Sequence, residues 1–152
     1  MQGQAQYPGA VCNNINEFSQ IMEKRAVNPW KWQDNFSFSQ AVELKAATRT
    51  LLCAGQASIS EQGQPLHKDD MEAQLNLTLR NIEIVINTGG YDWTDVVRLT
   101  IYTTDFDKLF QHYGLLAAKL EDTNPKPIIN LIGVNRLVFP ELLVEIEATA
   151  MK

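Results

Sequence analysis

The segment from Lys68 to Gly90 constrains the fold most, because it contains the start, the repeat and the end of one long amphipathic helix. Asp69 can cap this helix, and Glu72 three residues later completes a capping-box pattern. Apolar residues then recur at intervals of four, three and four, namely Leu75, Leu79, Ile82 and Ile86. Gly89 and Gly90 end the helix. Its apolar stripe must be buried against another layer of the domain.

Strands are predicted on both sides of this helix. Residues 36–44 and 50–55 are aromatic, aliphatic or small and are separated by a more polar stretch, which predicts a β-hairpin. Residues 95–103 are rich in β-branched side chains and alternate in the manner of a strand, with Val97, Leu99 and Ile101 on one face. Two further strands are predicted at residues 127–134 and 142–150.

A second helix is predicted after Asp105, which can cap it, and it ends before Asn124 and Pro125. The resulting order is ββαβαββ, and the fold class is α+β, a mixed sheet with two helices packed on one face. Two helices cannot cover both faces of such a sheet, so another subunit is expected to bury the other face. The apolar residues of the second helix are Phe106, Leu109, Tyr113, Leu116 and Leu120.

Residues 1–34 are predicted to form an N-terminal arm and residues 35–152 the folded domain. Within the arm, Ile15, Phe18, Ile21 and Met22 follow a helical spacing, which indicates a short amphipathic helix. An aromatic cluster follows, consisting of Trp30, Trp32, Phe36 and Phe38. It can line an apolar ligand pocket, and core packing or docking of the arm explains it equally well.

Composition excludes several classes of function. A net charge of −5 disfavours binding to nucleic-acid phosphates, which depends on clustered Lys and Arg. Cys12 and Cys53 lack a C-x-x-C spacing, so neither a disulfide scaffold nor a zinc site is expected, and a reduced, cytoplasmic setting fits best. No apolar run approaches the roughly 18 residues that cross a bilayer. No metal, cofactor or membrane partner is predicted.

The last strand carries the clearest candidate for chemistry. Its alternation places Glu145 and Glu147 on one face, while Val144, Ile146 and Ala148 point toward the helices. Burial and mutual repulsion can raise the pKa of one carboxylate and produce a general acid or base. The alternative is that the two glutamates pair with Arg98 or other cations across the sheet, and the residues taken alone favour this pairing.

The histidines and Cys53 could also carry chemistry, but a structural role is the expectation for each. His67 precedes the first helix in a polar segment and is expected to be exposed, while His112 lies beside the apolar stripe of the second helix. Neither has a partner at metal-ligand spacing. Cys53 occupies an apolar strand position, which is typical of an inert buried thiol.

Three stretches resemble the signature of the Rid family, also called the YjgF family. They are residues 53–56 leading toward Gly63 and His67, residues 95–102, and residues 140–148. The resemblance covers about residues 36–151. It implies a chorismate-mutase-like fold assembled as a homotrimer, with a central barrel and ligand clefts between subunits. Archetypal members hydrolyse reactive enamines and imines, such as 2-aminoacrylate, to a keto acid and ammonia.

The resemblance also assigns roles to residues. The glutamate thought to orient the attacking water corresponds to Glu145. The arginine that binds the substrate carboxylate is replaced by Ile129, and losing such a charged hydrogen bond costs about 1.5 to 3 kcal/mol. Arg98 and Arg136 are candidates to replace the missing cation. The expected cleft, more apolar than usual, consists of Phe38, Gly55, Tyr113, Ile129, Asn130 and Leu131.

Three functions are considered. The first is hydrolytic deamination of an enamine or imine that is larger or less acidic than 2-aminoacrylate. The second is a trimer that binds a small ligand or acts as a chaperone without catalysis. The third is an endoribonuclease or translation inhibitor, a label often attached to this family, which the acidic net charge disfavours.

Overall fold

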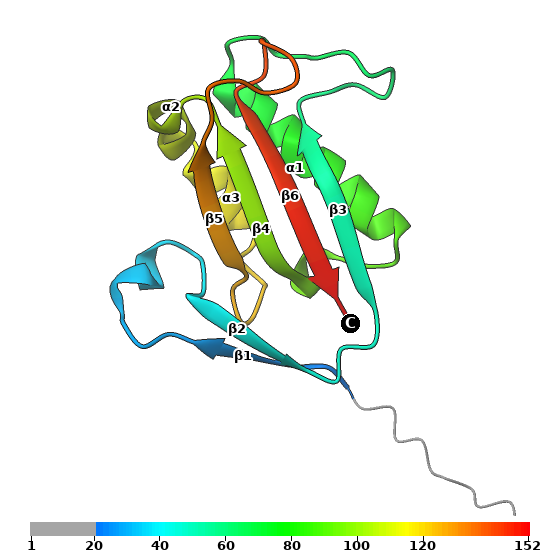
Figure 1. Cartoon of the computed structure of the whole chain (residues 1–152), viewed down its shortest axis with the longest axis vertical. Helices are drawn as coiled ribbons and strands as arrows, with labels where there is room; N and C mark the ends of the chain where they lie inside the picture. Colours follow the sequence, from blue (N-terminus) through cyan, green and yellow to red (C-terminus); the bar gives the residue numbers. More distant parts are fainter. Residues whose placement is uncertain (1–20) are drawn as a thin grey trace, which may run out of the picture.

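The computed structural model describes residues 21–152. Its main sheet has four strands, and Figure 1 shows the helices behind this sheet. In spatial order the strands are β3 (Thr50–Ala57), β6 (Val144–Met151), β4 (Val96–Thr103) and β5 (Ile128–Gly133). β6 pairs antiparallel with both β3 and β4, whereas β4 and β5 are parallel. The C-terminal strand therefore lies in the middle of the sheet, and β3 and β5 form its edges.

The helices lie on one face of this sheet, as the sequence predicted. The long helix is α1 (Met71–Thr88), and the second helix is divided into α2 (Phe106–Gln111) and α3 (Tyr113–Lys119) by a break at His112. The predicted stripe of α1 is buried in one cluster with Leu99 and Ile101 of β4 and with Ile146 of β6. A register irregularity between Val96 and Arg98 brings Val96 into this cluster, where the alternation had placed Val97. No helix in residues 21–152 is long and apolar enough to cross a membrane.

The predicted hairpin between residues 36–44 and 50–55 is wrong. β2 (Ala41–Lys45) pairs instead with β1 (Glu23–Val27) in a separate two-stranded ribbon, and β3 pairs with β6. The connection explains the difference, because Ala46 adopts a φ of 58° that turns the chain after β2. The backbone N–H groups of Thr48 and Arg49 then donate to the Lys152 carbonyl, at 2.7 and 2.9 Å, so the chain enters the sheet beside β6.

The ribbon also changes the description of the N-terminal region. β1 belongs to the segment predicted as an arm, yet it pairs along its whole length with a strand of the predicted domain. A short 3-10 helix, η1 (Trp32–Asn35), connects the two strands. Of the predicted arm helix, Ile15 and Phe18 lie outside the described residues, and Ile21 and Met22 precede β1 without helical structure.

Both predicted helices begin with an aspartate cap, but the cap of α1 is one residue later than predicted. Asp70, not Asp69, caps α1, and its carboxylate accepts a hydrogen bond of 3.0 Å from the Ala73 N–H. Asp69 has a φ of 64°, outside the extended conformation that a cap residue needs. Asp105 caps α2 as predicted, accepting from the Lys108 N–H at 3.0 Å. A further 3-10 helix, η2 (Trp93–Asp95), leads into β4 and contains a complete capping box.

A buried glutamine connects α1 to the start of β6. The amide nitrogen of Gln74 donates to the carbonyls of His67 and Glu141, at 3.0 and 2.8 Å. Its amide oxygen accepts the Leu143 N–H at 2.7 Å. These three bonds satisfy backbone groups of two loops that have no regular structure. They fix the chain immediately before Val144, where the strand that carries Glu145 begins.

We expect Gln74→Leu to lower the free energy of unfolding by about 3 kcal/mol, because it leaves three backbone groups without partners in a buried place. Urea unfolding monitored by circular dichroism measures the change. Asn76→Leu is the matched control on the exposed side of the same helix, and its effect should stay within about 0.5 kcal/mol. Equal effects of the two variants would contradict the role given to Gln74.

Candidate functional site

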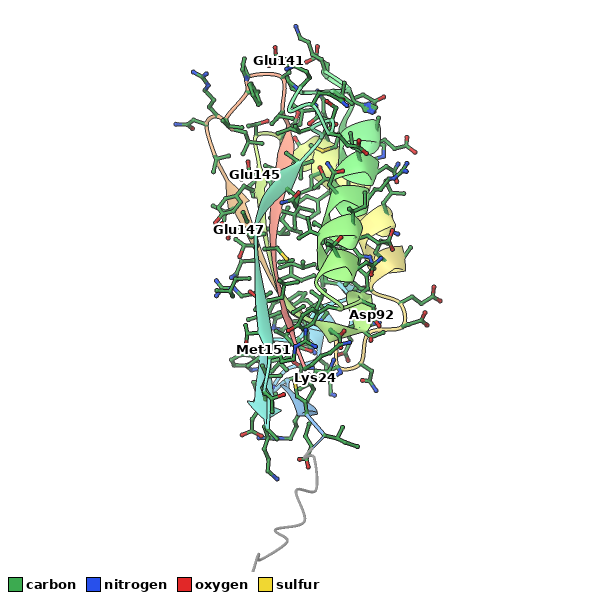
Figure 2. All side chains as sticks on the ribbon, turned by 90° about the vertical axis from the view of Figure 1, so that its right-hand side faces the viewer. Lys24, Asp92, Glu141, Glu145, Glu147 and Met151 are labelled. Carbon is green, nitrogen blue, oxygen red and sulfur yellow. The ribbon has the colours of Figure 1, made fainter. Side chains whose placement is uncertain are left out.

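The open face of β6 carries two carboxylates. Val144, Ile146 and Ala148 are buried toward the helices, and Glu145 and Glu147 lie half-buried on the opposite face, as the alternation predicted. Figure 2 views the sheet from its edge and shows both glutamates on the side away from the helices. The Tyr102 hydroxyl on β4 donates to one carboxylate oxygen of Glu147 at 3.2 Å.

Glu145 lies directly against the backbone of the edge strand β3. A methyl group added at Gly55 would come within 1.9 Å of the Glu145 Oε1 atom and 2.7 Å of its carboxyl carbon. The strand pairing shifts register between Cys53 and Gln56, so Gly55 sits in an irregular part of the ladder. Only a residue without a side chain leaves room for the carboxylate here. The structure thus brings together two residues that the sequence assigned to one site.

The surroundings of Glu145 disfavour its negative charge. Burial raises the pKa of this carboxyl group, and the nearby charge of Glu147 raises it further. Among residues 21–152, neither glutamate lies within ion-pair distance of Arg98. Neither forms an ion pair with any other cation of these residues, so the alternative in which the two glutamates pair with Arg98 or other cations across the sheet is contradicted within one chain. Glu145 is a partly shielded carboxylate that can hold or release a proton closer to neutrality than an exposed glutamate.

The raised pKa predicts how Glu145→Gln alters stability with pH. A group whose pKa is higher in the folded state contributes stability below its unfolded pKa and loses that contribution as pH rises through the folded pKa. Wild type therefore carries the cost of a shielded charge at neutral pH, and the glutamine variant does not. We expect the melting temperature of Glu145→Gln to exceed that of wild type at pH 7.5, and the difference to vanish near pH 4. A wild type that is the more stable at pH 7.5 would contradict the shift.

The remaining predicted site residues lie at the other edge of the sheet. Ile129, Asn130 and Leu131 belong to β5, which is separated from β3 by β6 and β4. Three strand spacings of about 4.8 Å put the two edges roughly 14 Å apart. Ile129 and Leu131 pack against the core, while Asn130 is exposed and lies opposite Thr100. Within one chain, these β5 residues do not meet Glu145.

Phe38 and Tyr113 belong to the β5 side as well. Phe38 lies in the loop before β2 and not on a strand, with its ring 5.8 Å from that of Trp32. The next residue, Ser39, donates its N–H to the carbonyl of Pro127, which precedes β5. The Tyr113 hydroxyl donates to the Phe36 carbonyl at 3.1 Å, and burial raises the pKa of this tyrosine. The ring of Tyr113 is thereby fixed beside the loop that carries Phe38.

Exposed aromatic side chains extend this region, and sequence reasoning missed part of it. Phe106 and Phe110 of α2 stack with ring centroids 6.0 Å apart, and Phe110 lies 6.3 Å from Tyr113. Phe106 belongs to the apolar repeat predicted for the second helix, yet 37% of its surface is exposed, and Phe110 is 53% exposed. Trp30, Trp32 and Phe36 are also exposed, which contradicts core packing as their explanation. The spacing of four residues between Phe106 and Phe110 was the available signal.

Cys53 and the two histidines are the other reactive side chains considered from the sequence. Cys53 is buried in the core cluster, as expected, and burial raises the pKa of its thiol. His67 is exposed, as expected. The His112 ring lies 3.9 Å from a Glu72 carboxylate oxygen on α1. In the part of the chain that the structure describes, no three His, Cys, Asp or Glu side chains gather as metal ligands.

Comparison with known proteins decides the family. Residues 33–152 match the family described as Endoribonuclease L-PSP, and a RutC family protein of Pyrococcus horikoshii is 30% identical over 115 residues. That alignment covers 76% of this chain and 86% of the relative. The chain belongs to the Rid/YjgF/L-PSP family. The resemblance stated from three short stretches is therefore confirmed at the level of the family.

Solved structures of Rid proteins share the fold. YyfB of Yersinia pestis, a Rid protein of unknown function, is 34% identical, with a TM-score of 0.77 over 85% of this chain and 98% of that one. A member of the YjgF/YER057c/UK114 family from Mycobacterium tuberculosis is 29% identical, with a TM-score of 0.58 over 86% of this chain and 100% of that one. The predicted α+β class with a YjgF-like mixed sheet is confirmed. The homotrimer stays a prediction.

Proposed function

We propose that this Rid protein is a hydrolytic deaminase of a reactive enamine or imine, with its clefts between the subunits of a homotrimer. The observation that carries the proposal is the placement of Glu145. Its carboxylate lies against Gly55 at an irregular edge strand, with a pKa raised by burial and by Glu147. A base with a pKa nearer to neutrality takes up and returns protons more effectively at physiological pH.

The chemistry moves one proton through Glu145 and a second through solvent. Glu145 accepts a proton from a water molecule while the water oxygen forms a bond to the imine carbon, and solvent donates a proton to the imine nitrogen. Glu145 then gives its proton to the amine nitrogen of the resulting carbinolamine. The carbon–nitrogen bond breaks, ammonia leaves, and the carbinolamine hydroxyl returns a proton to solvent to give the carbonyl product. One water is consumed for each ammonia released, and no oxidant or cofactor is needed.

The division of the site between two sheet edges supports the trimer. Glu145 and Gly55 belong to the β3 side, and Phe38, Tyr113 and Asn130 belong to the β5 side. Within residues 21–152, the outer edges of both β3 and β5 lack a strand partner. If the β5 edge of one subunit meets the β3 edge of the next, the two halves form one cleft. The central barrel that the family resemblance implies has this kind of arrangement.

The β5 side of the proposed cleft favours an apolar substrate. Ile129 aligns with the position where the archetypal arginine binds a carboxylate. The exposed Phe106 lies against Gly133 at the end of β5 and stacks on the exposed Phe110. An imine with a bulky apolar substituent would gain contact area there, at about 25 cal/mol for each Å² of apolar surface removed from water. A compact anionic substrate would find no opposite charge at Ile129. We therefore propose a substrate that is larger or less acidic than 2-aminoacrylate.

A panel of imines tests the proposal. Imines produced in situ by an amino acid oxidase from alanine, leucine, methionine and phenylalanine are mixed with the protein, and ammonia release is followed against the uncatalysed rate. Acceleration is expected, and it should be greatest for the bulky apolar imines. Light scattering on the same sample should give a mass three times that of the chain. A stable monomer, or the absence of acceleration for every imine, would contradict the proposal.

Two alternative functions have less support than the deaminase. The lack of a cation at Ile129 favours a ligand-binding or chaperone-like trimer without catalysis as the second candidate. Aromatic acids and keto acids would then raise the melting temperature although no imine is turned over. The family description names an endoribonuclease, but a net charge of −5 opposes affinity for RNA phosphates. Tight RNA binding at physiological salt would overturn that judgement.

A further inference from the structure

Glu145 and Glu147 form a pair of carboxylates whose members differ in one contact, the hydroxyl of Tyr102. The strand register places Tyr102 of β4 directly opposite Glu145 and Thr100 opposite Glu147. The Tyr102 side chain therefore starts beside Glu145, yet its hydroxyl reaches along the diagonal and donates to Glu147 at 3.2 Å. No hydrogen-bond donor within residues 21–152 contributes to the pKa of Glu145. Only one of the two carboxylates has a donor.

This single contact makes the two carboxylates chemically unequal. A hydrogen bond to the ionised form of a carboxyl group favours that form, whereas burial without a donor favours the protonated form. Two like charges at neighbouring positions also resist being present together. Burial, and after it the charge of Glu147, raises the pKa of Glu145. Paired carboxylates whose surroundings separate them in this way divide into one that stays charged and one that carries the proton.

The Tyr102 hydroxyl is a permanent donor. Its partial removal from water, followed by the charge of Glu147 and the hydrogen bond to it, raises the pKa of this phenol above its ordinary value. The charge of Glu145 adds to the rise, and Arg98 acts in the opposite direction. A phenol that keeps its proton cannot accept one from Glu147, so the direction of the hydrogen bond is fixed.

The other groups around the pair do not supply a second donor. On β4 the charged and titratable neighbours are Tyr102 and Arg98, and on β6 each glutamate faces the other. β3, on the other side of β6, contains no charged residue, and its cysteine is buried in the core. The helices lie on the opposite face of the sheet (Figure 2). Because Arg98 forms no ion pair with either glutamate in the described chain, Tyr102 alone distinguishes them.

We propose that Tyr102 is a positioning residue, which holds Glu147 as an anion and thereby directs the one proton of the carboxylate pair to Glu145. Tyr102 acts through Glu147 and does not touch the reacting atoms. The inference rests on the proposed function for the use of that proton, but the place of the proton is a property of the free protein. The contact lies within one chain, so a neighbouring subunit that covers this face strengthens it by removing water.

Carbon-13 NMR of protein labelled at the carboxyl carbon of glutamate side chains tests the assignment without substrate. The loss of one signal in Glu145→Gln and of another in Glu147→Gln identifies the two carboxylates. In wild type, Glu147 should ionise at a lower pH than Glu145. Tyr102→Phe keeps the ring and removes the donor, so the gap between the two midpoints should shrink by at least about half a pH unit. An unchanged gap, or ionisation of Glu145 before Glu147 in wild type, would overturn the proposal.

A matched control and a double variant separate indirect from direct action. Tyr91→Phe removes a hydroxyl from a tyrosine of the core cluster and should leave both midpoints unchanged. Glu147→Gln alone should lower the midpoint of Glu145, because the neighbouring charge is gone. Adding Tyr102→Phe to this variant should move the midpoint no further. A further shift would show that the tyrosine acts on Glu145 directly, which contradicts the proposal. Melting curves verify that each variant is folded.

The pH dependence of imine hydrolysis gives a second readout. The rate rises as Glu145 ionises, so the midpoint of this rise should move to lower pH in Tyr102→Phe, by the amount found in the NMR titration. A kinetic midpoint that stays in place while the NMR midpoint moves would remove Tyr102 from the reaction. If the NMR midpoints shift as expected and no imine is hydrolysed, the deaminase proposal fails and the assignment of the proton stands.

Discussion

Replacing Glu145 by glutamine is expected to lower the rate of imine hydrolysis by about 10²- to 10⁴-fold, the range that a general base contributes. Glutamine keeps the size of the side chain but accepts no proton from water. The substrate contacts on the β5 side are unchanged, so the loss should appear in kcat far more than in KM. Ammonia release from the most reactive imine of the panel measures both constants.

The control for this variant is Glu121→Gln, which removes one exposed carboxylate elsewhere in the chain and should keep the wild-type rate. The pH profile gives a second test. In wild type, the rate should rise with pH through the raised pKa of Glu145, because only the ionised carboxylate accepts a proton. That rise should be absent in Glu145→Gln. A glutamine variant as fast as wild type would remove Glu145 from the mechanism.

Gly55→Ala is expected to reduce the same rate by about 10²-fold while leaving the protein folded. The added methyl group would lie within 3 Å of three atoms of the Glu145 side chain, so the carboxylate must move away. The atoms in conflict belong to a flexible side chain, and Gly55 is not among the residues of positive φ. Alanine also restricts the unfolded chain, which offsets part of the steric cost by about 0.4 to 1 kcal/mol.

Gly114→Ala provides the matched control, because a methyl group at Gly114 meets no atom within 4 Å. Its rate and its melting temperature should stay close to those of wild type. Gly55→Ala should lose activity without losing stability. Its melting temperature should lie within a few degrees of that of wild type, while its rate of imine hydrolysis is strongly reduced. Full activity in Gly55→Ala would mean that the contact between this glycine and Glu145 has no catalytic role.

Local patterns in the sequence predicted the structure correctly where it depends only on residues that are close together in the chain. The stripe of α1, the cap at Asp105 and the alternation of Glu145 and Glu147 were all predicted correctly. Each depends on residues within one or two turns or on one strand, where the period of the backbone fixes which side chains share a face. The thiol of Cys53 was placed correctly for the same reason.

Partners that are distant in sequence could not be predicted in this way. Nothing local to β2 indicates that it pairs with β1 and that β3 pairs with β6, so the expected hairpin was wrong. Phe106 fits a helical stripe but lies beyond the edge of the core, and only the position of β5 beneath α2 decides its exposure. The division of the predicted cleft residues between two sheet edges is likewise a result of strand order.

The sequence by itself determined the long helix α1, the four strands of the main sheet and the family to which the chain belongs. The tertiary structure alone decided that the Glu145 carboxylate lies against Gly55 and that, within residues 21–152, Arg98 forms no ion pair with either glutamate. The physical reason is that periodicity acts within a few residues, whereas a contact between β3 and β6 joins positions about ninety residues apart. Such a contact forms because the whole core is buried together, and no single segment encodes it.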